Sequence, residues 1–311
     1  MRARNLRSLA SALLVAAATA GPARLHASEP KTLAAGGRTR VYRLHVPHGL
    51  PADKPAALVL VFHGGRGEGA TMERLVEFDA LADREGFLVA YPDGVGKQWN
   101  DGREVAEFES FREKVDDVAF VSALIDAIAK DHRVDPRRIF ATGISNGGIF
   151  SHFLAARLAG RIAAIAPVAG GIAEPFRASF QPERPVSVLM MNGTEDPLVP
   201  YHGGSVGGGK HGRVLDTDEA ARMWAAADGC AKDTRVETLP DADPHDGCRV
   251  RRSRWTGGRE GTEVVLYTFE RGGHTWPGGP QYLPRLMIGR VCHDVDATRV
   301  IWEFFKAHPR P

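Results

Sequence analysis

The pattern Gly-x-Ser-x-Gly, which can hold a nucleophilic serine on a tight turn, occurs twice in this chain. Ser145 is at the centre of residues 143–147, and Ser205 is at the centre of residues 203–207. The serine must stand between a strand and a helix for the turn to expose its hydroxyl. The first copy follows the predicted strand 138–142 and opens a helical pattern, whereas the second runs on into more glycine. The context favours Ser145 as the nucleophile, because a simple N-cap role would not explain the flanking glycines.

A serine hydroxyl needs a base to remove its proton, and a histidine base needs a carboxylate that fixes its tautomer. Both partners are expected downstream, in loops that follow strands, with the acid first. Asp196 follows the apolar run 186–191 and precedes a proline, which favours a turn; Glu195 is the alternative acid. His274 lies on a glycine-bracketed loop after the run 263–269. These two side chains and the serine form the predicted catalytic triad.

An oxyanion hole needs two backbone N–H groups that point at the developing negative charge. Asn146, the residue after the nucleophile, is predicted to supply one of them. Gly65 in the loop 63–67 is predicted to supply the other, with Arg66 as the alternative and an ordinary turn as the competing interpretation. Trp99 and Trp276 are candidate substrate contacts, with core packing as the alternative.

Buried strands and amphipathic helices must alternate to position these residues, and the hydrophobic pattern predicts that they do. Strands are expected at residues 41–46, 56–62, 87–91, 138–142, 162–168, 186–191 and 263–269, and helices at 71–84, 115–130, 147–158, 217–227 and 294–308. This alternation predicts an α/β fold with a mostly parallel central sheet flanked by helices. The glycine-rich run 203–209 and the polar segment 231–254 are expected to be loops. With no second core or repeat, we expect one catalytic domain over residues 28–311.

The first 27 residues have the composition of a secretory signal peptide. Three arginines precede the apolar stretch Leu9–Ala20, and cleavage is expected after Ala20 or Ala27. The sequence therefore predicts export to the periplasm or the extracellular space, with an uncleaved anchor as the alternative. No later apolar run approaches the length of a membrane span, so no membrane association is expected after processing.

Charge and cysteine content limit the partners that this chain is expected to have. A formal net charge of +2 gives no reason to expect a nucleic-acid partner. The three cysteines have no metal-binding spacing, so no metal site is predicted. In an exported protein, a disulfide between Cys230 and Cys248 is the preferred pairing, which leaves Cys292 as an odd, buried thiol. The oligomeric state is left open.

Several segments together resemble the extracellular polyhydroxybutyrate depolymerase family, which is close to the feruloyl and acetylxylan esterases of carbohydrate esterase family one. The segments are H-G-G-R-G (63–67), Y-P-D-G-V-G-K-Q-W-N (91–100), V-D-D-V-A-F-V (115–121), R-I-F-A-T-G-I-S-N-G-G (138–148), N-G-T-E-D-P-L-V-P-Y (192–201) and G-G-H-T-W-P-G-G (272–279). The resemblance implies an α/β-hydrolase fold with no large cap domain, and no cofactor or metal. It also implies that Ser145, Asp196 and His274 form the triad, and that Gly65 and Asn146 are the oxyanion donors.

The expected activity is therefore that of a secreted serine carboxylic-ester hydrolase that works through an acyl-enzyme. Feruloyl or acetyl esters of the plant wall and short hydroxyalkanoate esters are the expected substrates. Two other interpretations remain: a peptidase with the same triad, and an inactive hydrolase-fold binding protein. The chain length leaves no room for a gating domain, which argues against the peptidase.

Overall fold

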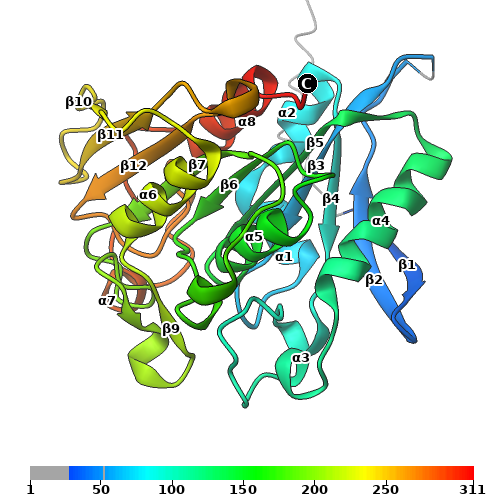
Figure 1. The fold of residues 1–311 in the computed structure, drawn as a ribbon, viewed down its shortest axis with the longest axis horizontal. Coiled ribbons are helices and arrows are strands. Elements are labelled where there is room, and N and C mark those ends of the chain that lie inside the picture. Colours follow the sequence, from blue (N-terminus) through cyan, green and yellow to red (C-terminus); the bar gives the residue numbers. More distant parts are fainter. Residues whose placement is uncertain (1–27, 52) are drawn as a thin grey trace, which may run out of the picture.

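The computed structural model describes residues 28–51 and 53–311, and the predicted signal peptide therefore lies outside the described residues. One sheet of ten strands runs through this part of the chain, in the order β1-β2-β4-β3-β5-β6-β7-β12-β11-β10 (Figure 1). Its strands are β1 (Pro30–Ala35), β2 (Arg38–His45), β3 (Ala56–Phe62), β4 (Leu88–Pro92), β5 (Val134–Ile144), β6 (Ala164–Val168), β7 (Ser187–Gly193), β10 (Arg235–Thr238), β11 (Arg249–Trp255) and β12 (Val264–Glu270).

The six central strands, from β4 to β12, are parallel, and antiparallel strands complete the sheet at both edges. Strand β3 is buried at every position, which is expected for a parallel strand that helices cover on both faces. The predicted α/β architecture with a mostly parallel sheet is therefore confirmed.

Two helical layers enclose the sheet. One layer contains α4 (Asp117–Asp131), α5 (Asn146–Arg157) and α6 (Thr217–Asp228), and the other contains α1 (Gly69–Val76), α2 (Phe78–Glu85) and α8 (Ala297–Ala307) (Figure 1). Two short helices, α3 (Glu109–Arg112) and α7 (Arg285–Ile288), lie in connecting segments, and the two-residue strands β8 (Gly204–Ser205) and β9 (Arg213–Val214) form a small separate ladder. Each layer buries its own hydrophobic cluster against the sheet.

Three elements differ from the sequence expectations. The helix expected at residues 71–84 is broken at Glu77, whose φ of +52° is left-handed, although the apolar spacing continues across the break. The strand expected at residues 41–46 is β2, and an additional strand, β1, pairs antiparallel with it and forms the edge of the sheet. The polar segment 231–254 contributes β10 and β11. The many arginines of β11 obscure the apolar pattern by which a strand is recognised in the sequence. In the structure these charges are paired: Arg254 with Glu263 at 2.6 Å, and Arg252 with Glu237.

The preferred disulfide between Cys230 and Cys248 is wrong in this structure, in which all three cysteines are free thiols. Cys230 packs against the hydrophobic cluster on the α4–α6 side of the sheet, whereas Cys248 and Cys292 belong to the cluster on the opposite side. The sheet therefore separates the two thiols that are nearest in sequence. As expected, Cys292 is buried.

Within residues 28–51 and 53–311, no helix has both the length and the apolar character needed to cross a membrane.

Candidate active site

The turn from β5 to α5 places Ser145 at the carboxyl edge of the sheet. Its φ of +59° and ψ of −122° are unusual for a residue with a side chain, as expected for a serine on a strained strand-to-helix turn. The flanking glycines allow β5 and α5 to approach β3, because a Cβ atom at Gly143 or Gly147 would lie 2.5 or 2.3 Å from the Phe62 carbonyl oxygen. The exposed Ser205, by contrast, lies in a two-residue strand.

Asp196 and His274, which are far apart in sequence, meet because their strands β7 and β12 are adjacent and parallel. The imidazole Nδ1 lies 2.7 Å from Asp196 Oδ2, and both side chains are buried. The other carboxylate oxygen, Oδ1, accepts the backbone N–H groups of Leu198 and Val199, each at 2.8 Å. The carboxylate is therefore fixed on both sides, and it holds the proton of His274 on Nδ1. The alternative acid, Glu195, is exposed.

His274 is also held through its backbone. Its N–H donates to the Ile288 carbonyl at 2.6 Å, and its carbonyl accepts the Tyr282 hydroxyl at 2.8 Å. Tyr282 is 37% exposed, but desolvation of its phenol, with a smaller contribution from the charge of Asp196, raises its pKa, so this phenol remains a donor at neutral pH. The loop therefore presents the imidazole in one orientation, with Nε2 free to act as a base.

A cavity of about 630 Å³ opens over Ser145 and His274. Within the described part of the chain, the serine hydroxyl has no hydrogen-bond partner, so the Ser–His bond is not formed in this structure. Such bonds often tighten only when a substrate is bound. Most of the wall is apolar, and two arginines contribute positive charge: the lining includes Met72, Leu75, Ile144, Leu198, Tyr282, Leu283, Ile288, Arg66 and Arg74. The cavity therefore suits an apolar acyl group with an oxygen-rich or anionic extension.

The loop after β3 brings backbone N–H groups to the same cavity. The N–H of Arg66 donates to the Lys97 carbonyl at 2.9 Å, so it is not available for an oxyanion. In the described chain the N–H of Gly65 has no protein acceptor, and that of Asn146 is at the first position of α5, where no intrahelical acceptor exists. Of the two candidates considered in the loop, Gly65 is therefore the one with a free donor.

His63 holds this loop against the neighbouring turn. Its Nδ1 lies 2.8 Å from the Gly64 carbonyl, and its Nε2 accepts the N–H of Gly94 at 2.9 Å. Burial lowers the pKa of His63, which matches a neutral ring that donates once and accepts once. These contacts make His63 a structural hydrogen-bonding residue of the loop.

Sequence reasoning missed a buried polar network behind the nucleophile. The Asn146 amide donates to Asp101 Oδ2 at 2.6 Å and accepts the backbone N–H of Trp99 at 2.8 Å. Asp101 in turn forms a buried ion pair of 2.7 Å with Arg103. The signal was the unusual run W-N-D-G-R (99–103), in which charged residues occur beside a tryptophan in an otherwise irregular segment. The network ties the first turn of α5 to this segment.

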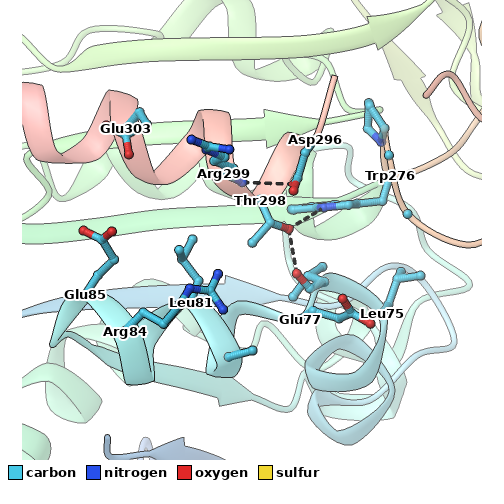
Figure 2. A pocket seen from close by; sticks show the side chains of 15 residues that line it. Leu75, Glu77, Leu81, Arg84, Glu85, Trp276, Asp296, Thr298, Arg299 and Glu303 are labelled. Atoms are coloured by element: carbon cyan, nitrogen blue, oxygen red, sulfur yellow. Dashed lines mark hydrogen bonds between the residues drawn. The ribbon is translucent and has the colours of Figure 1, made fainter. Parts of the chain in front are cut away.

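The two tryptophans that were expected at the substrate lie in the core instead. Trp99 is fully buried; it stacks on Phe150, and its indole N–H donates to the His63 carbonyl at 3.0 Å. Trp276 is 1% exposed and donates to Thr298 at 3.0 Å; it lines a different cavity, between α2 and α8 (Figure 2). Neither side chain lines the cavity over Ser145, because each indole fills space between the sheet and a helix. The cavity over Ser145 is lined instead by other large side chains, among them Tyr282 and Leu283.

The chain matches the protein family described as "Esterase PHB depolymerase" over residues 40–180. It is 36% identical over 254 residues to NocK of Nocardia uniformis subsp. tsuyamanensis, whose name assigns it to the esterases; the match covers 78% of this chain and 72% of that protein. It is 31% identical over 236 residues to Feruloyl esterase B of Piromyces equi, a match that covers 73% of this chain and 41% of that protein.

Solved structures agree on the fold. An acetyl xylan esterase from Aspergillus awamori superimposes with a TM-score of 0.55 at 14% identity, over 80% of this chain and 94% of that one. A thermostable esterase superimposes with a TM-score of 0.56 at 15% identity, over 91% of this chain and 63% of that one. The expected α/β-hydrolase fold is confirmed, and no large cap is evident in the described residues.

Proposed function

The chain belongs to the esterase family of the polyhydroxybutyrate depolymerases and is a carboxylic-ester hydrolase, and we propose that Ser145, His274 and Asp196 carry out its reaction. The observation that carries this proposal is the meeting of His274 Nδ1 and Asp196 Oδ2 at 2.7 Å, beside the cavity that contains the strained Ser145. A base with this orientation next to a serine that opens onto a cavity is the arrangement that nucleophilic acyl transfer requires.

In the first half-reaction, the Ser145 oxygen attacks the ester carbonyl while His274 Nε2 takes the hydroxyl proton. The imidazolium that forms is stabilised by the Asp196 carboxylate, which keeps its own two backbone N–H donors throughout. Collapse of the tetrahedral intermediate breaks the bond to the alcohol, which leaves with the proton from His274. The serine is then acylated.

In the second half-reaction, a water molecule gives a proton to His274 and attacks the acyl carbon. Collapse of this second tetrahedral intermediate breaks the bond between the acyl carbon and the Ser145 oxygen, which takes the proton back from His274, and the acid is released. The N–H groups of Gly65 and Asn146 hold the negative oxygen in both tetrahedral intermediates. Removing one such donor costs about 2.7–4 kcal/mol of transition-state stabilisation in other serine hydrolases. The His63 contacts and the Asn146 network keep the two donor segments in place before the substrate arrives.

For the substrate, we propose soluble feruloyl or acetyl esters of the plant wall, or short hydroxyalkanoate esters. The apolar wall near Tyr282 and Leu283 supports an acyl group larger than acetyl, and Arg66 suits a carboxylate or hydroxyl-rich extension. We expect methyl ferulate and a hydroxybutyrate oligomer to be cleaved faster than acetylated xylan. Two buried methylenes contribute roughly 1.6 kcal/mol, so p-nitrophenyl butyrate should exceed the acetate by up to about 15-fold in kcat/KM.

The proposal is tested with Ser145→Ala, and with Ser205→Ala as the matched control. Hydrolysis of p-nitrophenyl butyrate should fall by a factor of roughly 10⁴ or more in the first variant and remain unchanged in the second. Equal rates for Ser145→Ala and the native protein would end the serine assignment. Activity on a peptide substrate alone would favour the peptidase, and no activity on any ester would favour the binding protein.

Export is part of the same proposal. The protein recovered from the periplasm or the medium should begin after Ala20 or Ala27, and N-terminal sequencing would identify the site. Recovery of the chain only with its first residues intact would contradict processing.

A further inference from the structure

Cys248 and Cys292, which are distant in sequence, lie side by side, and the segment that contains Cys292 contacts the loop that carries His274. Both are buried, and their Sγ atoms lie within 4.8 Å of each other and of an Asp246 carboxylate oxygen. The proposed mechanism uses neither thiol. We propose that Cys248 and Cys292 form a disulfide that fixes the backbone support of His274. The proposal rests on the export suggested above, because an exported chain meets oxidising conditions.

A single carboxylate holds the two cysteine segments together. Asp246 Oδ1 accepts the N–H of Cys248 at 2.6 Å, and Oδ2 accepts the N–H of His293, the neighbour of Cys292, also at 2.6 Å. The same two segments are also linked by a carboxylate of the second one, because Asp294 Oδ1 accepts the N–H groups of residues 242 and 243 at 2.7 and 3.0 Å. The fold therefore holds these two thiols in proximity without any covalent link.

The same three side chains are also of types that bind metals. Both oxygens of Asp246, however, already accept backbone N–H groups, so a cation would have to compete for their lone pairs. That leaves two thiols, whereas a structural zinc ion takes four protein ligands. The contacts therefore favour the bond between the two sulfur atoms over a metal site.

Bond formation requires little movement. An S–S bond is about 2.05 Å long, and rotation of a cysteine between staggered rotamers moves its Sγ atom by roughly 3 Å. The two thiols lose two protons and two electrons in the reaction. An oxidised dithiol, such as oxidised glutathione or a disulfide oxidoreductase, accepts the electrons and is reduced to its two thiols.

The bond would stabilise the loop that carries the proposed base. The segment that ends at Cys292 accepts three N–H groups from that loop: Ile288 from His274 at 2.6 Å, Arg290 from Gly273 at 2.9 Å, and Cys292 from Gly278 at 2.8 Å. Cys248 immediately precedes β11, which pairs with β12, the strand that leads to the same loop. A disulfide would thus join both sides of the support for His274.

Trypsin separates the three cysteines, which makes the test direct. Cys230, Cys248 and Cys292 fall in peptides 223–232, 236–249 and 291–299. The exported protein, or the folded protein after treatment with oxidised glutathione, is denatured and alkylated without reductant, then digested and analysed by mass spectrometry. Denaturation is needed because both thiols are buried, and contact with Cys248 raises the pKa of Cys292. We expect a linked 236–249/291–299 pair and an alkylated Cys230.

Alkylation of all three cysteines, or a link that includes Cys230, would overturn the proposal. It would also be overturned if Cys248 and Cys292 resist alkylation only until a metal chelator is added, because a bound metal would then explain their protection. Cys292→Ser should lower the Tm of the oxidised protein by roughly 5–15 °C, and reduction of the native protein should give the same loss. Cys230→Ser should keep the link. The peptide link is read without any activity measurement, and the N-terminus is read separately, so failure of this proposal is distinct from failure of the esterase or export proposals.

Discussion

Replacing Asp196 with asparagine exchanges one carboxylate oxygen, a hydrogen-bond acceptor, for an amide –NH₂ donor. The shape of the side chain in the proposed active site is unchanged. In the native chain, Oδ1 accepts two backbone N–H groups, and Oδ2 faces His274 Nδ1 at 2.7 Å. The asparagine oxygen is expected to remain with the two N–H groups. A flipped amide would leave both donors unpaired in a buried position, which costs about 2–6 kcal/mol. The amide –NH₂ therefore points at His274.

An amide donor at Nδ1 forces the imidazole to carry its proton on Nε2. The ring then cannot take a proton from Ser145, so kcat should fall by about 10⁴-fold while KM changes little. The fold should be retained, because the carboxylate and the amide have the same shape and the two backbone hydrogen bonds are kept.

The measurement is steady-state hydrolysis of p-nitrophenyl butyrate by Asp196→Asn, with thermal denaturation of the same sample. Glu195→Gln is the matched control, since its side chain is exposed next to the same turn, and it should keep full activity. If Asp196→Asn stays within tenfold of the native rate, or if Glu195→Gln loses as much, the reasoning from this geometry is refuted.

Three further outcomes are expected. Gly65→Ala should lower kcat by roughly 10- to 100-fold, because its Cβ would lie 3.0 Å from both amide atoms of Gln98; Gln98→Ala should restore part of the loss, and an unchanged kcat in Gly65→Ala would contradict the donor role. Asn146→Ala should lower the Tm by roughly 5–10 °C, because it removes a 2.6 Å hydrogen bond to the buried Asp101 carboxylate; an unchanged melting curve would show that this network adds no stability. Burial raises the pKa of Asp228 to about 7, so the folded state binds a proton that the unfolded state has released. The resulting stability is present below pH 4 and is lost as the pH rises through 7. Asp228→Asn should therefore raise the Tm more at pH 9 than at pH 5, and an equal shift at both pH values would contradict the assignment.

The sequence was most informative where a residue type and its neighbours are both constrained by backbone geometry. The turn around Ser145 needs glycines before and after it, and the buried runs of β3 and β7 need apolar residues on both faces. Those signals are local, so they could be found without coordinates. They predicted the alternation of strands and helices along the chain and the loops that carry Asp196 and His274.

The misses have a common physical cause, which is that they depend on contacts between distant segments. Strand β11 is rich in arginine and became recognisable only when its acidic partners were known. The expected Cys230–Cys248 pair failed because proximity in sequence does not say which face of the sheet a thiol occupies. Trp99 and Trp276 were placed at the substrate by residue type, but space between the sheet and its helices determined where they pack.

The position of β12 has a consequence for how this enzyme is made. β12 is the last strand of the sheet in chain order, and it inserts between β7 and β11, both of which are synthesised earlier. Asp196 and His274 therefore remain apart until nearly the whole chain has been synthesised and this long-range parallel pairing has formed. Because such pairing is slow compared with helix formation, partly folded chains will already contain the serine turn without its base. We therefore expect the proposed triad, and with it the esterase activity, to form only when β12 has paired with β7, and recovery of activity after dilution from denaturant to report on that pairing.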